Sequence, residues 1–174
     1  MSSLIHRYSP VKLDDYNFQH SPYDPAIAYA SSKSCNIWFA NELERRYAGK
    51  GLHGISLHPG GIETGLQRFH APDYLQLMQQ VMIQDPDIMK TFKSLEQGAA
   101  TTVLAAIGRS FEGKGGVYLD DCAVAKPWLS DQGIAAPGYA PWAFDEAGQE
   151  KLWKDSLTFV GLTDENDDKP YGDA

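Results

Sequence analysis

This sequence has few cysteines and fewer basic than acidic residues. The two cysteines, Cys35 and Cys122, are too few for a framework of disulfides and lack the spacing of a metal site. The chain has 15 Lys and Arg against 23 Asp and Glu, a formal charge of −8, and its basic residues are scattered. A nucleic acid or an anionic membrane surface needs a basic patch, so we expect neither as a partner.

Long hydrophobic runs are also missing. No apolar stretch approaches the roughly 20 residues of a membrane-spanning helix, and the first residues do not read as a secretory signal. With so few cysteines, these features favour a reducing, cytoplasmic location. The length of 174 residues suits one domain.

The hydrophobic pattern predicts alternating helices and strands. Residues 4–25 form a loop, after which Asp24 caps a helix over 26–48 with Pro25 at its first position. A second helix over 94–108 begins at Ser94, and a last helix covers 146–162. Short strands over 52–57 and 116–119 lie between them. Strands separated by helices pair in parallel, so the fold class is α/β, with residues 1–162 in one domain and 163–174 as a disordered acidic tail.

Tyr29 and Lys33 form a polar pair at the beginning of the first helix. Residues four apart share one helix face, so a phenol and an ammonium are presented together. Tyrosine ordinarily has a pKa of about 10 and is a poor base, but an adjacent cation favours its phenolate. Composition alone gives about 0.5 such pairs by chance, in the manner of any short motif, and Tyr8 and Lys12 form another around Pro10. The pair alone is therefore weak support for catalysis.

Five passages in order strengthen that hypothesis. They are "SSLIHR", "AYASSKSCNIWFANELERRY", "GISLHPGGIET", "LEQGAATTVLAAIG" with "GGVYLDDC", and "GQEKLW". Together they resemble the C-terminal half of a short-chain dehydrogenase/reductase, in the branch of retinol dehydrogenases and WW-domain oxidoreductases. The resemblance implies the C-terminal portion of a doubly wound, parallel Rossmann-type sheet that lacks the N-terminal dinucleotide-binding strands.

The resemblance also implies the roles of particular residues. Tyr29 would exchange the proton of an alcohol or carbonyl, Lys33 would stabilise the phenolate and hold the nicotinamide ribose, and Ser3 would orient the substrate oxygen. Against this, Ser3 lies so close to the terminus that its segment would ordinarily be frayed. The NADP or NAD cofactor would contact Tyr29, Lys33, Pro59, Gly60, Ile62 and Thr64. Without the resemblance, residues 59–61 (Pro-Gly-Gly) would indicate only an ordinary turn at the end of a strand.

Residues 65–92 would cover the substrate in this family. Their apolar side chains suggest a small lipophilic alcohol or ketone, although such residues are more often simple packing: Leu75, Leu77, Met78, Val81, Met82 and Met89. Four histidines lack metal-ligand spacing and are expected at the surface or in turns: His6, His53, His58 and His70. Asp120, Asp121 and Cys122 are expected to be structural.

The family's first strands, with the glycine-rich phosphate turn and the catalytic asparagine, have no counterpart here. We therefore expect weak cofactor binding by this chain alone, exposed apolar faces on helix 26–48 and strand 52–57, and an isolated chain that associates and is inactive. Three interpretations stay open: the catalytic half of an oxidoreductase, a remnant that no longer catalyses, and an interaction module. The last would pair with a full-length relative, forming a homo- or hetero-oligomer through helix 26–48.

Overall fold

Two parallel strands form the centre of the molecule, and helices cover both of their faces. The computed structural model describes residues 1–62, 92–132 and 136–163. Strand β1 (Ile55–His58) pairs in parallel with β4 (Val117–Asp120), and β5 (Ala123–Val124) adds an antiparallel edge. A separate parallel pair joins β2 (Gly61–Ile62) to β3 (Phe92–Lys93). The predicted α/β class with parallel pairing is thus confirmed.

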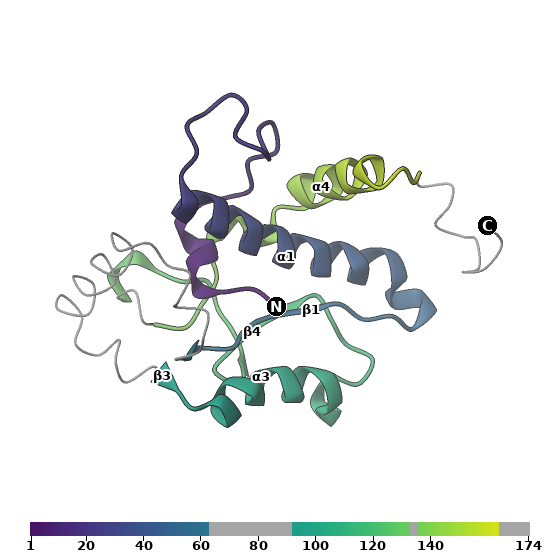
Figure 1. The fold of residues 1–174 in the computed structure, drawn as a ribbon. Helices are drawn as coiled ribbons and strands as arrows, with labels where there is room; N and C mark the ends of the chain where they lie inside the picture. Colours follow the sequence, from purple (N-terminus) through teal and green to yellow (C-terminus); the bar gives the residue numbers. More distant parts are fainter. Residues whose placement is uncertain (63–91, 133–135, 164–174) are drawn as a thin grey trace.

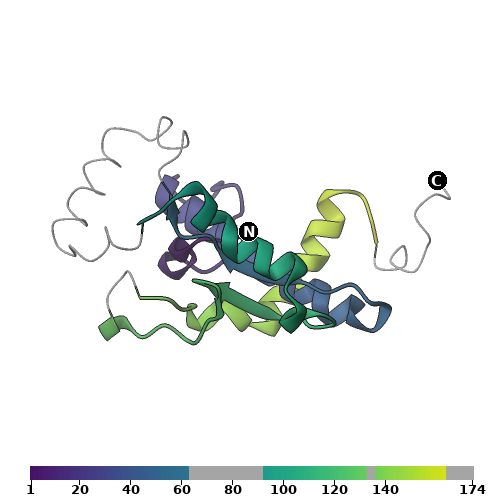
Figure 2. The same cartoon turned by 90° about the horizontal axis from the view of Figure 1, so that it is seen from below.

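Three α-helices are described, and they lie on opposite sides of this sheet. Helix α1 (Pro25–Tyr47) covers one face and α3 (Leu95–Ile107) the other, as Figure 1 shows, and Figure 2 views the layers from the side of α3. Helix α4 (Glu146–Phe159) packs against α1 on the same side of the sheet. Short 3₁₀ helices join these elements: η1 (Leu4–Tyr8), η2 (Ala48–Lys50), η5 (Arg109–Phe111), η6 (Ser130–Gln132) and η7 (Pro141–Phe144).

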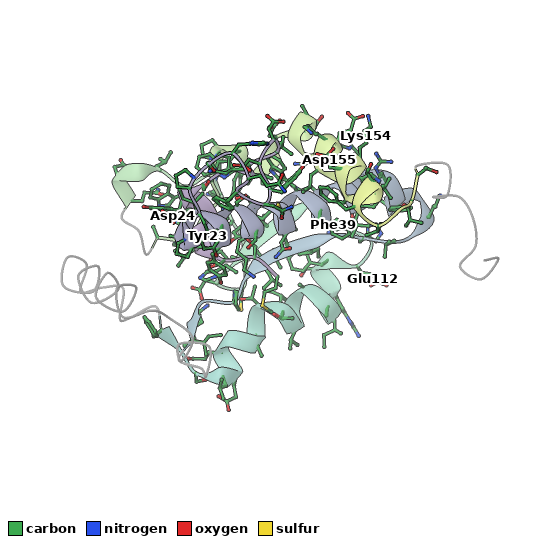
Figure 3. All side chains as sticks on the ribbon, turned by 45° about the horizontal axis from the view of Figure 1, so that its top comes forward. Tyr23, Asp24, Phe39, Glu112, Lys154 and Asp155 are labelled. Atoms are coloured by element: carbon green, nitrogen blue, oxygen red, sulfur yellow. The ribbon has the colours of Figure 1, made fainter. Side chains whose placement is uncertain are left out.

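The helix boundaries follow their capping residues. The Asp24 carboxylate accepts hydrogen bonds from the amides of Ala26 and Ile27, at 2.8 and 3.0 Å, so α1 begins as predicted. Figure 3 shows Asp24 at this end of the helix. At α3, the Ser94 hydroxyl and the Gln97 side chain form a reciprocal capping box.

Two expectations about local structure are wrong. The supposed loop over 4–25 contains η1, and the strand predicted over 52–57 begins only at Ile55. Gly51 turns the chain with a φ of 83°, and Leu52 is half exposed. The strand starts where Gly54 passes so close to α1 that an added Cβ would lie 2.1 Å from the Ala40 carbonyl oxygen.

The core forms where α1 meets the strands and the C-terminal segment. Ile37, Tyr118 and Ala143 make one buried cluster, and Trp38 with Val11 and Leu152 makes a second. Complete burial of a side chain as large as isoleucine contributes roughly 1.5–3 kcal/mol. The predicted exposure of the strand is wrong, since Leu57 retains only 5% of its surface. The predicted exposure of the helix is found at Phe39, which Figure 3 shows on α1 and which is 45% exposed.

Candidate active site

Three segments meet at one edge of the sheet because of its topology. Residues 1–3 run beside β1, where the Ser2 amide donates to the Leu57 carbonyl at 2.7 Å. The chain then crosses over through α1, whose first turn lies above this edge, and β1 ends at the same edge in the Pro59–Gly61 turn. The carboxyl edge of parallel strands is the usual place of a ligand site in such folds.

Helix α1 presents Tyr29 and Lys33 together. The Lys33 ammonium lies 5.2 Å from the centre of the Tyr29 ring, and the tyrosine is 44% exposed. Within the described part of the chain, no carboxylate forms an ion pair with Lys33. The phenol is thus open to solvent, with a cation over its ring.

The second Tyr-x-x-x-Lys sequence behaves differently. Tyr8 ends η1 and is 67% exposed. Lys12 instead bonds to the Ser21 hydroxyl at 3.0 Å and lies over the Phe18 ring. Identical spacing therefore brings phenol and ammonium together only where a continuous helix supports it.

The segment with Ser3 is held in place, so the expectation of a frayed terminus is wrong. Ser2 is 97% buried, and its hydroxyl donates to the Lys33 carbonyl at 2.9 Å. The Asn36 side chain donates to the Met1 carbonyl at 2.8 Å. Ser3 itself caps η1, with its hydroxyl 3.4 Å from the Ile5 amide. These bonds place residues 1–3, which we call the serine segment, directly beside the turn of α1 that carries Lys33.

Two of the four histidines contradict their predicted surface location. His6 is completely buried, and His58 is 93% buried. Burial lowers the pKa of each to about 4, and the positive charge of Arg7 adds to the effect. His53 is half-buried and bonds to Glu44, while His70 lies outside the described residues.

The turn after β1 approaches α3 and β3. Gly60 has a φ of 99°, and an added Cβ would lie 2.6 Å from the Lys93 side chain. The Ile62 side chain packs on Gly98 of α3, while its backbone pairs with Lys93. Thr64 and the proposed substrate cover over 65–91 lie outside the described residues. These contacts explain the turn by packing alone. The cofactor contacts predicted for it stay predictions.

Charged groups are buried just below this edge. Asp120 is 94% buried and accepts the Gly138 amide at 3.2 Å, and burial raises the pKa of its carboxyl. Arg7 donates to the Ala136 carbonyl at 2.9 Å, and its charge favours the ionised Asp120. Asp120 is therefore structural, as predicted from its position at the strand end.

Only part of a nicotinamide dinucleotide suits these residues. The Tyr29 hydroxyl and the Lys33 ammonium are available for the ribose beside the nicotinamide. A pyrophosphate needs unoccupied amides at a helix N-terminus. Each of the three described α-helices has a side-chain cap that already accepts one or two of these amides: Asp24 in α1, Ser94 in α3 and Asp145 in α4.

A glycine pattern typical of phosphate turns does occur, in another context. Gly49, Gly51 and Gly54 have the spacing G-x-G-x-x-G. They lie after α1 and before β1, whereas a phosphate turn leads from a strand into a helix. Gly54 instead allows the close approach to Ala40 of α1 that is described above. The pattern supplies no phosphate site.

Metal and membrane features are absent from the described ranges. Residues 1–62, 92–132 and 136–163 contain no group of three His, Cys, Asp or Glu side chains arranged to hold a metal ion. No helix within these ranges has the length and apolar character needed to cross a bilayer.

Sequence reasoning missed three residues that build this site. Ser2, His6 and Ser34 are buried and join the serine segment to α1. Ser34 directly follows Lys33, and a serine on the buried face of a helix needs a hydrogen-bond partner. That requirement was the available signal, but its partner, the His6 carbonyl, is 28 residues away in the sequence.

Comparison with curated proteins gives strong similarities over nearly the whole chain. The sequence is 46% identical over 164 residues to the short-chain dehydrogenase/reductase prx1 of Penicillium roqueforti, covering 94% of this chain and 46% of that protein. It is 31% identical over 163 residues to retinol dehydrogenase 14 of Homo sapiens, covering 93% and 43%. The chain therefore spans about half the length of the curated relatives it matches. No family model matches it.

A solved structure supports the fold. The crystal structure of an uncharacterized protein from Mycobacterium paratuberculosis superposes with a TM-score of 0.59 at 23% identity, covering 92% of this chain and 48% of that one. At this identity the likeness concerns the fold alone, and this chain again covers about half of the other chain.

The buried His58 predicts a loss of stability in mild acid. The unfolded imidazole has an ordinary pKa of 6.5 and takes up a proton as the pH falls below that value, whereas the folded one resists until about pH 4. The free energy of unfolding should therefore fall between pH 7 and pH 4.5, with His58 contributing about 2 kcal/mol. Urea unfolding of wild type and His58→Asn at both pH values, at fixed protein concentration, measures this contribution.

The exposed His20 provides the control for this experiment. His20→Asn should leave the pH dependence of wild type unchanged. An equally steep dependence in His58→Asn and wild type would contradict the assignment.

Proposed function

This chain belongs to the short-chain dehydrogenase/reductase family, and we propose that it provides the catalytic half of an NAD(P)-dependent oxidoreductase that interconverts alcohols and carbonyls. The proposal assigns proton transfer to Tyr29, with Lys33 and Ser3 beside it.

One observation supports the proposal most directly. The serine segment is bonded to α1 at Lys33, through the 2.9 Å bond from the Ser2 hydroxyl, and Lys33 lies over Tyr29. The three proposed catalytic residues thus belong to two segments that are joined at the catalytic lysine. The bond reaches the Lys33 backbone, so it fixes the serine segment relative to the helical turn that carries the lysine.

The proposed chemistry moves one proton. In carbonyl reduction, the Tyr29 hydroxyl donates its proton to the substrate oxygen, and the resulting phenolate is stabilised by the Lys33 ammonium. In alcohol oxidation the phenolate takes the proton back. The Ser3 hydroxyl would orient the substrate oxygen. A nicotinamide dinucleotide, when bound, accepts or supplies the hydride.

The cofactor would be held mainly at its nicotinamide end. Tyr29 and Lys33 suit the adjacent ribose, and Pro59, Gly60, Ile62 and Thr64 are proposed around the ring. The helix N-termini of the described residues are occupied, so we propose weak binding of NADP or NAD by this chain alone. Choice between the two cofactors depends on residues near the second ribose, outside this site.

The substrate proposal concerns a small lipophilic alcohol or ketone. It depends on the apolar residues of 65–91, which lie outside the described part of the chain. The retinol dehydrogenase relatives carry the name of such an alcohol.

A pairing function is the second candidate, with another copy of this chain as the partner. The exposed residues of α1 recur at Tyr29, Ser32, Asn36 and Phe39, which is the spacing of a single helix face. Phe39 remains 45% exposed although it stacks on Trp153 of α4. Covering this face would remove apolar surface from water.

The cofactor proposal predicts that the pyrophosphate adds little affinity. NADH, NADPH and reduced nicotinamide mononucleotide should bind the isolated chain with similar, millimolar dissociation constants in calorimetric and fluorescence titrations. Lys33→Met should weaken all three. Micromolar binding of a dinucleotide would contradict the absence of an anchor.

The proton-transfer proposal predicts that residual turnover depends on Tyr29. The expected inactivity of the isolated chain should hold at micromolar cofactor. At millimolar cofactor, where concentration replaces the anchor, the proposal predicts slow reduction of an apolar ketone. Tyr29→Phe should lower that rate by about 10²-fold or more. Tyr8→Phe is the matched control and should retain the rate of wild type. Equal rates in both variants would overturn the role of Tyr29.

The pairing proposal predicts self-association through α1. Wild type should sediment as a dimer or larger species, and Phe39→Glu should dissociate it. Ile107 is 79% exposed on α3, so Ile107→Glu tests an apolar site on the opposite side of the sheet and should not change the mass. A monomeric, cooperatively folded wild type would contradict the pairing function.

A further inference from the structure

His6 is a buried polar side chain near the candidate site, and both of its ring nitrogens have backbone partners. It has no exposed surface and belongs to the same short helix that Ser3 caps. Its Nδ1 lies 2.6 Å from the Ser3 carbonyl oxygen, and its Nε2 accepts the Ala140 amide at 3.1 Å. The ring also packs on Tyr118 of β4, with ring centres 5.0 Å apart.

These contacts determine the tautomer of the ring. A carbonyl oxygen only accepts hydrogen bonds, so Nδ1 must carry a hydrogen. A backbone amide only donates, so Nε2 must be unprotonated. The neutral Nδ1–H form satisfies both partners, whereas the imidazolium leaves the Ala140 amide without an acceptor and the Nε2–H tautomer leaves both partners without a bond.

The backbone of His6 is bonded as well. Its carbonyl accepts the Ser34 hydroxyl at 3.2 Å and the Trp142 indole at 3.1 Å. Ser34 follows Lys33 on α1, and its hydroxyl also reaches the Ser9 carbonyl at 2.9 Å. One residue thereby joins the serine segment, the catalytic helix and residues 140–142.

We propose that His6 is a positioning residue, which acts through its neutral Nδ1–H tautomer to hold the Ser3 backbone in register with the Lys33 turn of α1 and with residues 140–142. The inference concerns the site of the proposed function and rests on it for the role of Ser3. Its structural content is independent of catalysis. A substitution at His6 should remove the side-chain bond to the Ser3 carbonyl or the bond from the Ala140 amide. Which bond is lost depends on which ring nitrogen the new side chain replaces.

Two substitutions at His6 each replace the hydrogen bond of one ring nitrogen and remove that of the other. The amide of His6→Asn can replace Nδ1–H and donate to Ser3, but it cannot reach Ala140. The longer His6→Gln can place its amide oxygen near the position of Nε2 and accept from Ala140. The Ser3 carbonyl would then lose the ring donor and keep only the backbone amide of residue 6, at 3.1 Å.

Amide hydrogen exchange and ¹⁵N NMR of the full chain test the proposal. In wild type at neutral pH, the His6 ring should show a protonated Nδ1 and an unprotonated Nε2. The Ala140 amide should exchange about tenfold faster in His6→Asn and at the wild-type rate in His6→Gln. The Ser2 amide, which reports the seating of the serine segment on β1, should show the opposite pattern.

Each outcome decides the question without an activity measurement. An Nε2–H tautomer or an imidazolium in wild type would overturn the proposal, and this result needs no variant that must fold. Equal acceleration of both amides in both variants would show a general packing role instead. If Tyr29→Phe retained turnover while the exchange pattern appeared as expected, the proposed function would fail and the positioning by His6 would stand.

Discussion

The parallel pairing of β1 with β4 is the constraint on which the structure depends. Parallel strands require cover on both faces, and their connection must cross over the sheet through a helix. Helix α1 covers one face and α3 the other (Figure 1). The same topology brings the serine segment, the first turns of α1 and the turn after β1 to one edge. The site is therefore a consequence of how two short strands are paired.

Helix α1 combines packing and chemistry by dividing its faces. Ile37 and Trp38 are buried against the sheet and the C-terminal segment, while Tyr29 stays accessible. Between them, Ser34 is buried and bonded to the serine segment. A buried hydroxyl without partners would cost roughly 1–3 kcal/mol. The bonds of Ser34 remove that cost only when the serine segment is in place, so the packing of α1 and the alignment of the site are coupled.

The sequence could predict features that depend on neighbouring residues. The cap at Asp24, the capping box at Ser94 and the shared face of Tyr29 and Lys33 all follow from spacings of at most four residues. The burial of His6 and the anchoring of Ser2 could not be predicted in this way, because their partners, Ala140 and Leu57, are distant in the sequence. The start of β1 at Ile55 likewise depends on the close approach of Gly54 to α1. Local patterns singled out the candidate residues Tyr29 and Lys33, and tertiary contacts determine how the segments that carry them are held.

The two ends of a nicotinamide dinucleotide place different demands on a fold. The nicotinamide end, as proposed, would use side chains on α1 and the neighbouring segments, and hydrogen bonds within the chain fix the positions of these segments. The pyrophosphate end needs open amides at a helix N-terminus, and the described helices already use one or two of theirs to bond the capping side chains of Asp24, Ser94 and Asp145. Opening any of the three would sacrifice a helix cap, which contributes about 1 kcal/mol. Asp24 and Asp145 would, in addition, place a carboxylate beside the phosphates. Alignment of the proposed proton-transferring groups thus depends on other contacts than anchoring of the cofactor would, and the described residues show the first set of contacts.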